Sequence, residues 1–456
     1  MDVVTIARWQ YAIITVYHFF FVPITLGMTI FIALTESRYV KTGDETYKRM
    51  AKFWGHLLII NFAIGVATGI VQEFQFGMNW SEYSRMVGDI FGAPLAIEAL
   101  LAFFLESVFI GVWVFGWTRL SPKAHMRAAW LVAIGSNLSA IWILVANSWM
   151  QEPVGYVMNA KTGFANMNDF FAVATNPHVL LQFPHVFTAG LATAGFFVMG
   201  ISAWHLLRKK PETQDFFTRS FSRGAKFAAV GAILVALIGH TQAQHMVETQ
   251  PMKMAAAEAL WQTADPAGLS IFATIDEKNQ KNGMDIRIPG ALSFLTHNKF
   301  SGKVEGMKEL QARYEKKFGP GDYIPPVWIT FWSFRIMVGL GGIMILLALI
   351  AWLKSRKETL TSSPFFLKIM FWSMLMPTIA ISLGWIMTEV GRQPWLVFGL
   401  MKTQDGVSKA VSPGVAMFGF VTYLLVYTVL IFFYLFLMRK YAIKDPPLAN
   451  ADSEGK

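Results

Sequence analysis

The sequence of 456 residues contains no cysteine. This absence excludes disulfides, thiolate metal sites, iron–sulfur clusters and covalent haem attachment through a CxxCH motif. Any bound metal must therefore be held by His, Met, Asp or Glu side chains.

Charged residues are also scarce. They make up 15% of the chain, against about a quarter in ordinary soluble domains. Hydrophobic residues make up 54%, and the mean hydropathy is +0.43. This composition predicts an integral membrane protein. We expect no removable signal peptide, because the first apolar run, from near Tyr11, is too long for one and lacks a small-residue cleavage site.

Apolar stretches of about 20 residues, the length that crosses a bilayer, predict an all-α, polytopic protein with nine transmembrane helices. They lie near residues 11–35, 53–75, 93–117, 128–150, 178–206, 225–247, 327–353, 367–389 and 414–438. The predicted parts are helices 1–6 (1–247), a long polar loop (248–326), and helices 7–9 with a tail (327–456).

Basic residues alternate between the connections. They are dense in 36–52, 118–127, 207–226, 354–368 and after Arg439, and sparse in 76–92 and 151–177. The positive-inside rule then places the N-terminus outside and the C-terminus in the cytoplasm. The net charge of +10 follows from this topology, so no nucleic-acid partner is needed to explain it.

The loop 248–326 is extracytoplasmic in this topology and carries amphipathic patterns at Met252–Gln262 and Glu305–Phe318. Loops of this length in compact proteins are usually functional. Lys253 and Glu258, near the start of the first pattern, could bind the head group of a lipophilic substrate; a solvated helix face is the alternative. No internal repeat supports the inverted-repeat design of transporters.

Glu389 follows an apolar run from Ile369 to Leu383, and an ionisable group at membrane depth is a functional-site hypothesis by default. The topology puts it in the outer half of the membrane, with five other candidates. These are His18, Glu98, Glu106, His185 and Met337.

His185 and Met337 suit the axial positions of a low-spin haem, and the intramembrane cation Arg335 could face a propionate. Spacing alone does not single out Met337 among 24 methionines. A hydrogen-bonded core histidine is the alternative for His185. Three further histidines compete with it as ligands: His178, His240 and His245.

His18 lies in the aromatic segment Tyr17–Phe21, where a flat macrocycle could bind. Glu98 and Glu106 are eight residues apart, or roughly 12 Å along one helix face. They suggest a proton relay or metal ligands, and a bond to a neighbouring helix is the alternative. Small polar residues could continue a path towards the cytoplasm: Ser107, Ser139 and Asn147.

Several motifs together resemble subunit I of cytochrome bd quinol oxidase over nearly the whole chain. They are Gly391-Arg392-Gln393-Pro394-Trp395 after Gly384-Trp385 and Glu389, Pro94–Glu98 running to Phe103–Ser107, Trp332–Met337, and Gln250–Glu258. The loop between helices 6 and 7 has only about 80 residues, which is similar to the short-loop branch of that family.

The resemblance implies a terminal oxidase of the bacterial cytoplasmic (inner) membrane. Such an enzyme oxidises membrane quinol at the outer face and reduces O2 to water with cytoplasmic protons, building a proton motive force without pumping. The implied cofactors are a low-spin haem b (b558 type), a high-spin haem b (b595 type) and haem d, which haem b replaces in some members. The implied partners are a homologous subunit II and a small single-helix subunit.

The resemblance also assigns roles to residues. His185 and Met337 match the axial pair of the low-spin haem, whereas His18 and Glu389 match the proximal ligands of the two high-spin haems, without saying which serves which. The remaining matches are Glu98 near the oxygen site, Glu106 with Ser107 and Ser139 in proton delivery, Trp385 between haems, Arg392 balancing charge beside Glu389, and Lys253 and Glu258 as the quinol pair.

Two other functions remain open from the residues themselves. An ion or solute transporter would explain Glu98 and Glu106, but not His185, Met337 and the clustering on one side. A membrane cytochrome b without oxygen chemistry would carry haem but consume no oxygen.

Overall fold

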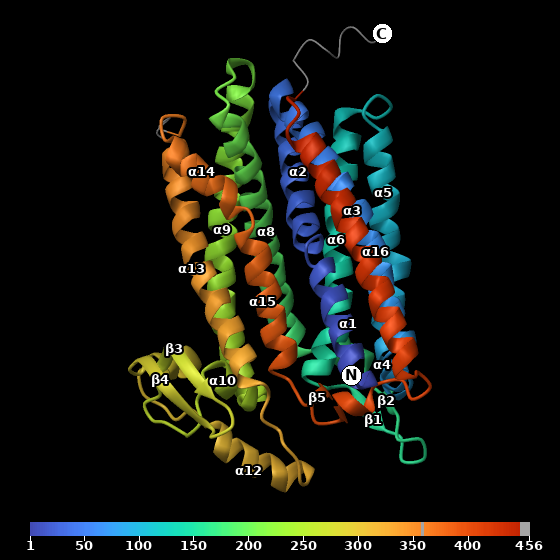
Figure 1. Cartoon of the computed structure of the whole chain (residues 1–456). Coiled ribbons are helices and arrows are strands. Elements are labelled where there is room, and N and C mark those ends of the chain that lie inside the picture. The colour runs from blue at the N-terminus through green and yellow to red at the C-terminus, as the bar shows by residue number, and fades with distance from the viewer. Residues whose placement is uncertain (357–359, 447–456) are drawn as a thin grey trace.

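The computed structural model describes residues 1–356 and 360–446, and the last ten residues of the predicted tail lie outside this part. Within it, nine helical spans are long and apolar enough to cross a membrane, as predicted. They run side by side as one bundle (Figure 1). Each predicted apolar range overlaps one span, which confirms the mostly helical, nine-span architecture.

Four of the spans are interrupted helices. In chain order, the elements of the bundle are α1 (Val3–His18), α2 (Val22–Thr42), α3 (Glu45–Met78), α4 (Ser81–Ile97), the π-helical η1 (Glu98–Phe103), α5 (Phe104–Phe115), α6 (Pro122–Gln151), α7 (Phe170–Ala174), α8 (Pro177–Leu207), α9 (Pro211–Thr249), α13 (Val327–Arg356), α14 (Pro364–Ser373), α15 (Met376–Val390) and α16 (Pro413–Ala442).

The interruptions have local causes in the sequence. Pro23 and Pro377 stand in the first turns of α2 and α15, where a residue without an N–H is tolerated, so each apolar run divides just before its proline. His18 is consequently the last residue of α1. The π-helical turn begins at Glu98, and such turns occur often at functional sites.

The segment between α9 and α13 folds against one end of the bundle (Figure 1). It comprises α10 (Pro251–Ala257), the antiparallel strands β3 (Leu269–Asp276) and β4 (Lys281–Ile288), α11 (Ala291–His297) and α12 (Met307–Phe318). The amphipathic patterns predicted α10 and α12, but not the hairpin. Met252, Leu310 and Tyr314 share a buried cluster with Phe331, which fastens this segment to α13.

Two shorter hairpins lie at the same end of the bundle as α10 and the N-terminus, whereas α16 ends at the opposite end (Figure 1). They are β1 (Tyr156–Met158) with β2 (Ala165–Met167), and β5 (Trp395–Val397) with β6 (Met401–Lys402), followed by the 3-10 turn η2 (Thr403–Asp405). Since α1 begins at one end of the bundle and α16 ends at the other, the described helices fit an odd number of spans.

Candidate functional site

One face of α6 carries a series of hydrogen-bonding side chains. Near its middle, Ser136 donates to Glu106 Oε1 on α5, and one turn later Ser139 donates to Glu98 Oε1 at 2.6 Å. Both carboxyl groups are buried. Glu98 and Glu106 thus both face α6, and each accepts a hydrogen bond from a serine hydroxyl of that helix.

The same face of α6 reaches Glu389 near its C-terminal end. Asn147 Nδ2 and Gln151 Nε2 donate to Glu389 Oε1 at 3.1 and 3.2 Å. Arg392 pairs with the other carboxylate oxygen and donates through Nε to Trp395 O at 3.3 Å. Arg392 therefore lies beside Glu389 and balances its charge, and two amide donors also bind the carboxylate.

Lys253 approaches this group from α10. Its buried Nζ donates to Gln151 Oε1 at 2.6 Å, while its stem packs against Gly391, where a Cβ would lie 2.8 Å from Lys253 Cγ. Burial lowers the pKa of Lys253 well below its ordinary value. One amide, Gln151, thus links the amine of Lys253 to the carboxylate of Glu389.

Glu258 and Arg335 form a second link between α10 and the bundle. Arg335 Nη2 lies 2.5 Å from Glu258 Oε2 and also donates to Ala257 O at 3.2 Å. Burial raises the pKa of Glu258, and the adjacent guanidinium opposes that shift. Arg335 Nε and Glu258 Oε1 are buried and make no hydrogen bond to the described residues. Arg335 was expected to face a propionate, and its nearest acid in the protein is Glu258.

His18 has the surroundings of a pre-oriented metal ligand. The Thr68 hydroxyl donates to the carbonyls of Ile64 and Gly65, so its oxygen accepts the proton of His18 Nδ1 at 2.9 Å. This leaves the lone pair on Nε2, the arrangement usual for a ligating imidazole. Gly69 leaves room for the ring, since a Cβ there would lie 3.0 Å from His18 Cε1.

His185 and Met337 both lie against α9. The His185 ring packs on Gly239, where a Cβ would lie 3.2 Å from Cε1, and its buried Nδ1 makes no hydrogen bond of normal geometry to the described residues. Met337 packs against the small buried cluster of Ala257, Phe334 and Met387, which also contacts Met246 of α9. Met246 lies seven residues, or about 10 Å, along α9 from Gly239. Its thioether also occupies the space beside Gly384, where a Cβ would lie 2.7 Å from Sδ. An orphaned imidazole nitrogen and a confined thioether are the donors that a six-coordinate haem iron uses.

Trp385 and Ser107 lie in different settings. Trp385 packs edge to face on Phe19, with ring centroids 5.5 Å apart, and so lies between α15 and the end of α1. The Ser107 hydroxyl donates to Phe104 O in its own helix at 3.3 Å and makes no hydrogen bond to the carboxyl group of Glu106.

Sequence reasoning missed Ser136 and Gln151. A small polar residue in an apolar helix gives a weak signal, because such residues commonly bond neighbouring helices. Gln151 stands just past the predicted end of its helix, and only the packing of α10 against it reveals its partner.

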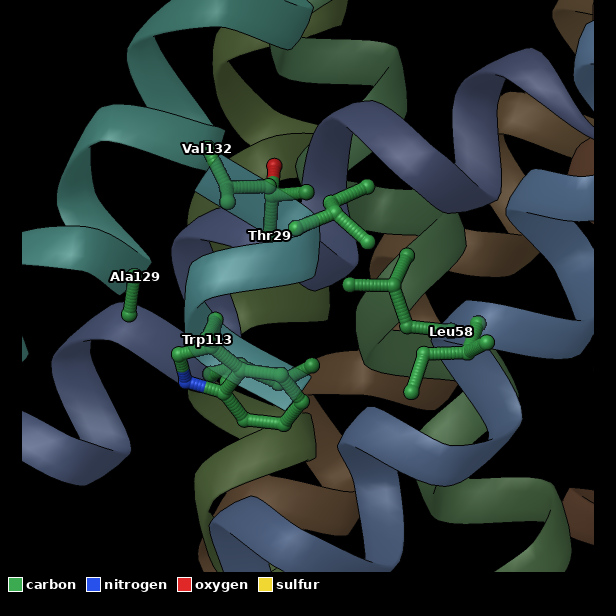
Figure 2. A pocket seen from close by; sticks show the side chains of 8 residues that line it. Thr29, Leu58, Trp113, Ala129 and Val132 are labelled. Atoms are coloured by element: carbon green, nitrogen blue, oxygen red, sulfur yellow. The ribbon is translucent and has the colours of Figure 1, made fainter. Parts of the chain in front are cut away.

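An apolar cavity of about 20 Å³ lies further along α6, on the side of Glu106 away from Glu389. Figure 2 shows Trp113, Leu58 and Val132 in its wall. It is large enough for about one water molecule and has an almost wholly apolar lining, so it is not the cofactor site.

Comparison with known proteins identifies the family. A family model described as cytochrome bd terminal oxidase subunit I matches residues 6–446. The chain belongs to the cytochrome bd terminal oxidase subunit I family. It is 53% identical to cytochrome bd ubiquinol oxidase subunit 1 of Bacillus subtilis, over 94% of this chain and 91% of that one.

Two further relatives agree. Cytochrome bd-II ubiquinol oxidase subunit 1 of Escherichia coli is 38% identical over 99% of this chain and 98% of its own length. A chain of the solved bd oxidase from Geobacillus thermodenitrificans superposes with a TM-score of 0.88 at 28% identity, covering 96% of this chain and 98% of that one.

Membership confirms the resemblance and decides between the alternative functions. The chain is a subunit of a quinol:O2 oxidoreductase, a haem-dependent terminal quinol oxidase, and a multi-pass protein of the bacterial inner membrane. The transporter and the cytochrome b without oxygen chemistry are therefore set aside.

Proposed function

We propose that this chain is the haem-carrying subunit of an oxidase that oxidises quinol at the α10 end of the bundle and draws protons for O2 reduction from the other end. This generates a proton motive force without a pump. The observation that carries the proposal is the hydrogen-bond series from Lys253 through Gln151 to Glu389. It joins the folded segment 248–326 to the polar face of α6. In this proposal that segment is the extracytoplasmic quinol-binding loop, the N-terminus is outside and the C-terminus is cytoplasmic.

Lys253 and Glu258 are the proposed quinol contacts. Burial lowers the pKa of Lys253 and so favours its neutral amine, which can accept the proton of a quinol hydroxyl at Nζ. Glu258 is paired with Arg335 through Oε2, and its buried Oε1 makes no hydrogen bond to the described residues, so this oxygen can accept from the other quinol hydroxyl. Lys253 lies in the short helix α10 and Glu258 caps its C-terminus, so the two proposed contacts belong to one short stretch of the chain.

The donor sets fit the implied cofactors. We assign His185 and Met337 to a low-spin haem b (b558 type), and His18 and Glu389 to a high-spin haem b (b595 type) and to haem d, or haem b in its place. When bound, these haems supply the one-electron transfer and the reduction of O2. The chain orients the ligands: Thr68 fixes the His18 ring, Asn147 and Gln151 hold Glu389, and Gly384 makes room for Met337.

Charged and aromatic residues complete the cofactor environment. Arg335 and Arg392 each keep a buried guanidinium nitrogen without a hydrogen bond to the described residues, and so could bind propionates. Trp385 is the proposed aromatic between haems, supported by its packing against Phe19 beside His18.

Glu106 and Glu98 are the proposed end of the proton path. Ser136 and Ser139 donate to these carboxyl groups from one face of α6, which suits a relay towards the oxygen site. Ser107 remains a predicted neighbour of this path. Protons that cross the membrane in this way separate charge against about 2.3 kcal/mol per charge per 100 mV.

The proposed partners are a homologous subunit II and a small single-helix subunit. The outward faces of several spans support this, because they expose large apolar side chains that need lipid or protein contact: Phe74, Phe104, Phe115, Phe418 and Phe432.

A reduced-minus-oxidised spectrum of the purified complex, with quinol-dependent oxygen uptake, tests this function. We expect one low-spin and two high-spin haem signals, and oxygen uptake that builds a membrane potential in proteoliposomes. Glu389→Ala should remove one high-spin signal, whereas Glu82→Ala, at a pair with the exposed Arg85, should remove none. A complex without haem bands would contradict the proposal.

A further inference from the structure

Three titratable side chains outside the proposed haem and quinol contacts meet at the α10 end of the bundle. Glu152 caps the C-terminus of α6, His178 lies in the first turn of α8, and His245 lies in the last turns of α9. His245 Nε2 is 2.8 Å from Glu152 Oε2, and the two imidazole centroids are 5.5 Å apart. One donor atom from each residue lies within 4.8 Å of the other two.

His178 is the member that lacks partners. It is 8% exposed, and neither ring nitrogen makes a hydrogen bond to any described residue. An unsatisfied buried polar group costs about 1–3 kcal/mol. The backbone nevertheless holds His178 in place: its N–H donates to Asn176 Oδ1 at 2.8 Å, and Asn176 Nδ2 donates to Glu152 O at 2.8 Å. A fixed, buried imidazole with free nitrogens is suited to bind a ligand.

The donor set is that of an open zinc site. Two imidazoles and one carboxylate, with a fourth position left for water, are a common arrangement around Zn²⁺. With bonds of about 2.0–2.2 Å, tetrahedral donors lie roughly 3.3 Å apart. Donor atoms that lie within 4.8 Å of one another would therefore move closer by at most about 1.5 Å to bind an ion. The Glu152 side chain is 24% exposed, which leaves an entry for the ion.

The surrounding charges permit a dication. Lys253 and Arg392 are the basic side chains that act on His178. Burial lowers the pKa of Lys253 well below its ordinary value, and Arg392 is paired with Glu389. Neither cation therefore opposes the ion at full strength, and Glu152 supplies a compensating negative charge.

We propose that Glu152, His178 and His245 bind a divalent transition-metal ion of the zinc class. The site joins the ends of three spans, α6, α8 and α9. It does not rest on the assignment of haem ligands or of quinol contacts. Since Glu152 directly follows Gln151, a bound ion would also fix the end of α6 beside Lys253.

Metal content of the purified, haem-loaded complex tests the site. After treatment with a chelator and equilibration with Zn²⁺, about one tightly bound zinc per chain is expected by mass spectrometry. His178→Ala and His245→Ala should each weaken binding by at least tenfold. His240→Ala is the matched control on α9, because its imidazole bonds to Asn298 outside the cluster and its loss should leave zinc bound. Mg²⁺ should not compete, since imidazole ligands do not suit it.

Stability gives a second measurement. Zn²⁺ should raise the Tm of the parent complex and of His240→Ala, but not that of His178→Ala, because a ligand stabilises only the state that binds it. The haem spectrum shows whether each variant is folded. If a histidine variant loses its haem, Glu152→Gln replaces it as the test variant, because Glu152 is the most exposed of the three proposed ligands. Absence of stoichiometric zinc, or unchanged zinc in the ligand variants, would overturn the proposal.

Discussion

Arg335 and Glu258 form an ion pair that is almost fully removed from water, with side chains 9% and 0% exposed. Glu258 caps the C-terminus of α10 and Arg335 lies in α13, so the pair holds the folded segment 248–326 onto the bundle. Removing one member of such a pair leaves a buried charge without compensation, which is worse than removing both.

Arg335→Leu should therefore destabilise the complex by about 3–5 kcal/mol, and the double variant Arg335→Leu/Glu258→Leu should recover much of that loss. Thermal unfolding of the purified complex measures both. Arg313→Leu is the matched control, because its pair with Glu305 is 49% and 34% exposed and such pairs contribute about 0–1 kcal/mol. Equal losses for Arg335→Leu and Arg313→Leu would contradict this account.

Met337→Leu should convert the low-spin haem to a high-spin form, because leucine fills the space beside Gly384 but offers no sulfur. Absorption spectra of the reduced complex check this, with Met344→Leu on the same helix as the control. An unchanged spectrum would remove Met337 from the ligands.

Gln151→Leu should raise the apparent quinol KM by about 3–10-fold, because each lost hydrogen bond contributes about 0.5–1.5 kcal/mol. Gln151→Glu separates the two halves of the link: a carboxylate still accepts from Lys253 but cannot donate to Glu389. We expect it to spare the KM while perturbing the haem held by Glu389. Steady-state oxygen uptake measures the KM, and absorption spectra report the haem. If Gln151→Leu changed neither the quinol KM nor the haem spectrum, the link through Gln151 would have no role in function.

Lys253→Met should stabilise the complex at neutral pH while weakening quinol oxidation. Burial lowers the pKa of Lys253 well below its ordinary value in the folded state, whereas in the unfolded chain the pKa is about 10.4. Folding therefore carries a cost at pH 7 that disappears as pH rises towards the unfolded pKa. The Tm of Lys253→Met should exceed that of the parent by about 2 °C or more at pH 7 and converge with it near pH 10. A gap that widens with pH would contradict the neutral amine.

Ser136→Ala should slow proton-coupled oxygen reduction by about 3–10-fold, the value of one hydrogen bond to Glu106. Glu106→Gln should cost at least about 100-fold, as expected for a group that transfers protons. Ser107→Ala should have a smaller effect than Ser136→Ala, since its hydroxyl bonds to its own helix. The rate of charge separation in proteoliposomes compares the three variants. A larger loss for Ser107→Ala than for Ser136→Ala would contradict Ser136 as the hydroxyl partner of Glu106 and favour Ser107.

The spans were predictable because bilayer thickness imposes one length on every apolar run. The buried acids, His18 and His185 could be named as candidates for a related reason: polar groups at membrane depth need an explanation. Met337 could not be singled out in this way among 24 methionines, and its candidacy depended on the neighbouring Arg335 and on the motif Trp332–Met337. The motifs then supplied the family, which the comparisons confirm.

Contacts between segments were not predictable in this way. Which residue of α6 meets Glu106 depends on the rotation of that helix, so Ser136 was missed. The acidic partner of Arg335 is Glu258, and the backbone carbonyl of Ala257, 78 residues away in sequence, accepts a second hydrogen bond from Arg335. The strands β3 and β4 were not predicted, although Met284, Ile286 and Ile288 alternate with polar residues in β4.

The polar face of α6 has one last consequence, which concerns the length of the helix. Ser136, Ser139, Asn147 and Gln151 fall within a sector of about 120° only because their separations match the helical repeat. Deleting one residue between Ser139 and Asn147 would turn Gln151 by about 100° relative to Ser136 and separate the quinol end from the acids. Members of the family can therefore vary the amino acids of this stretch, but insertions and deletions in it should be rare.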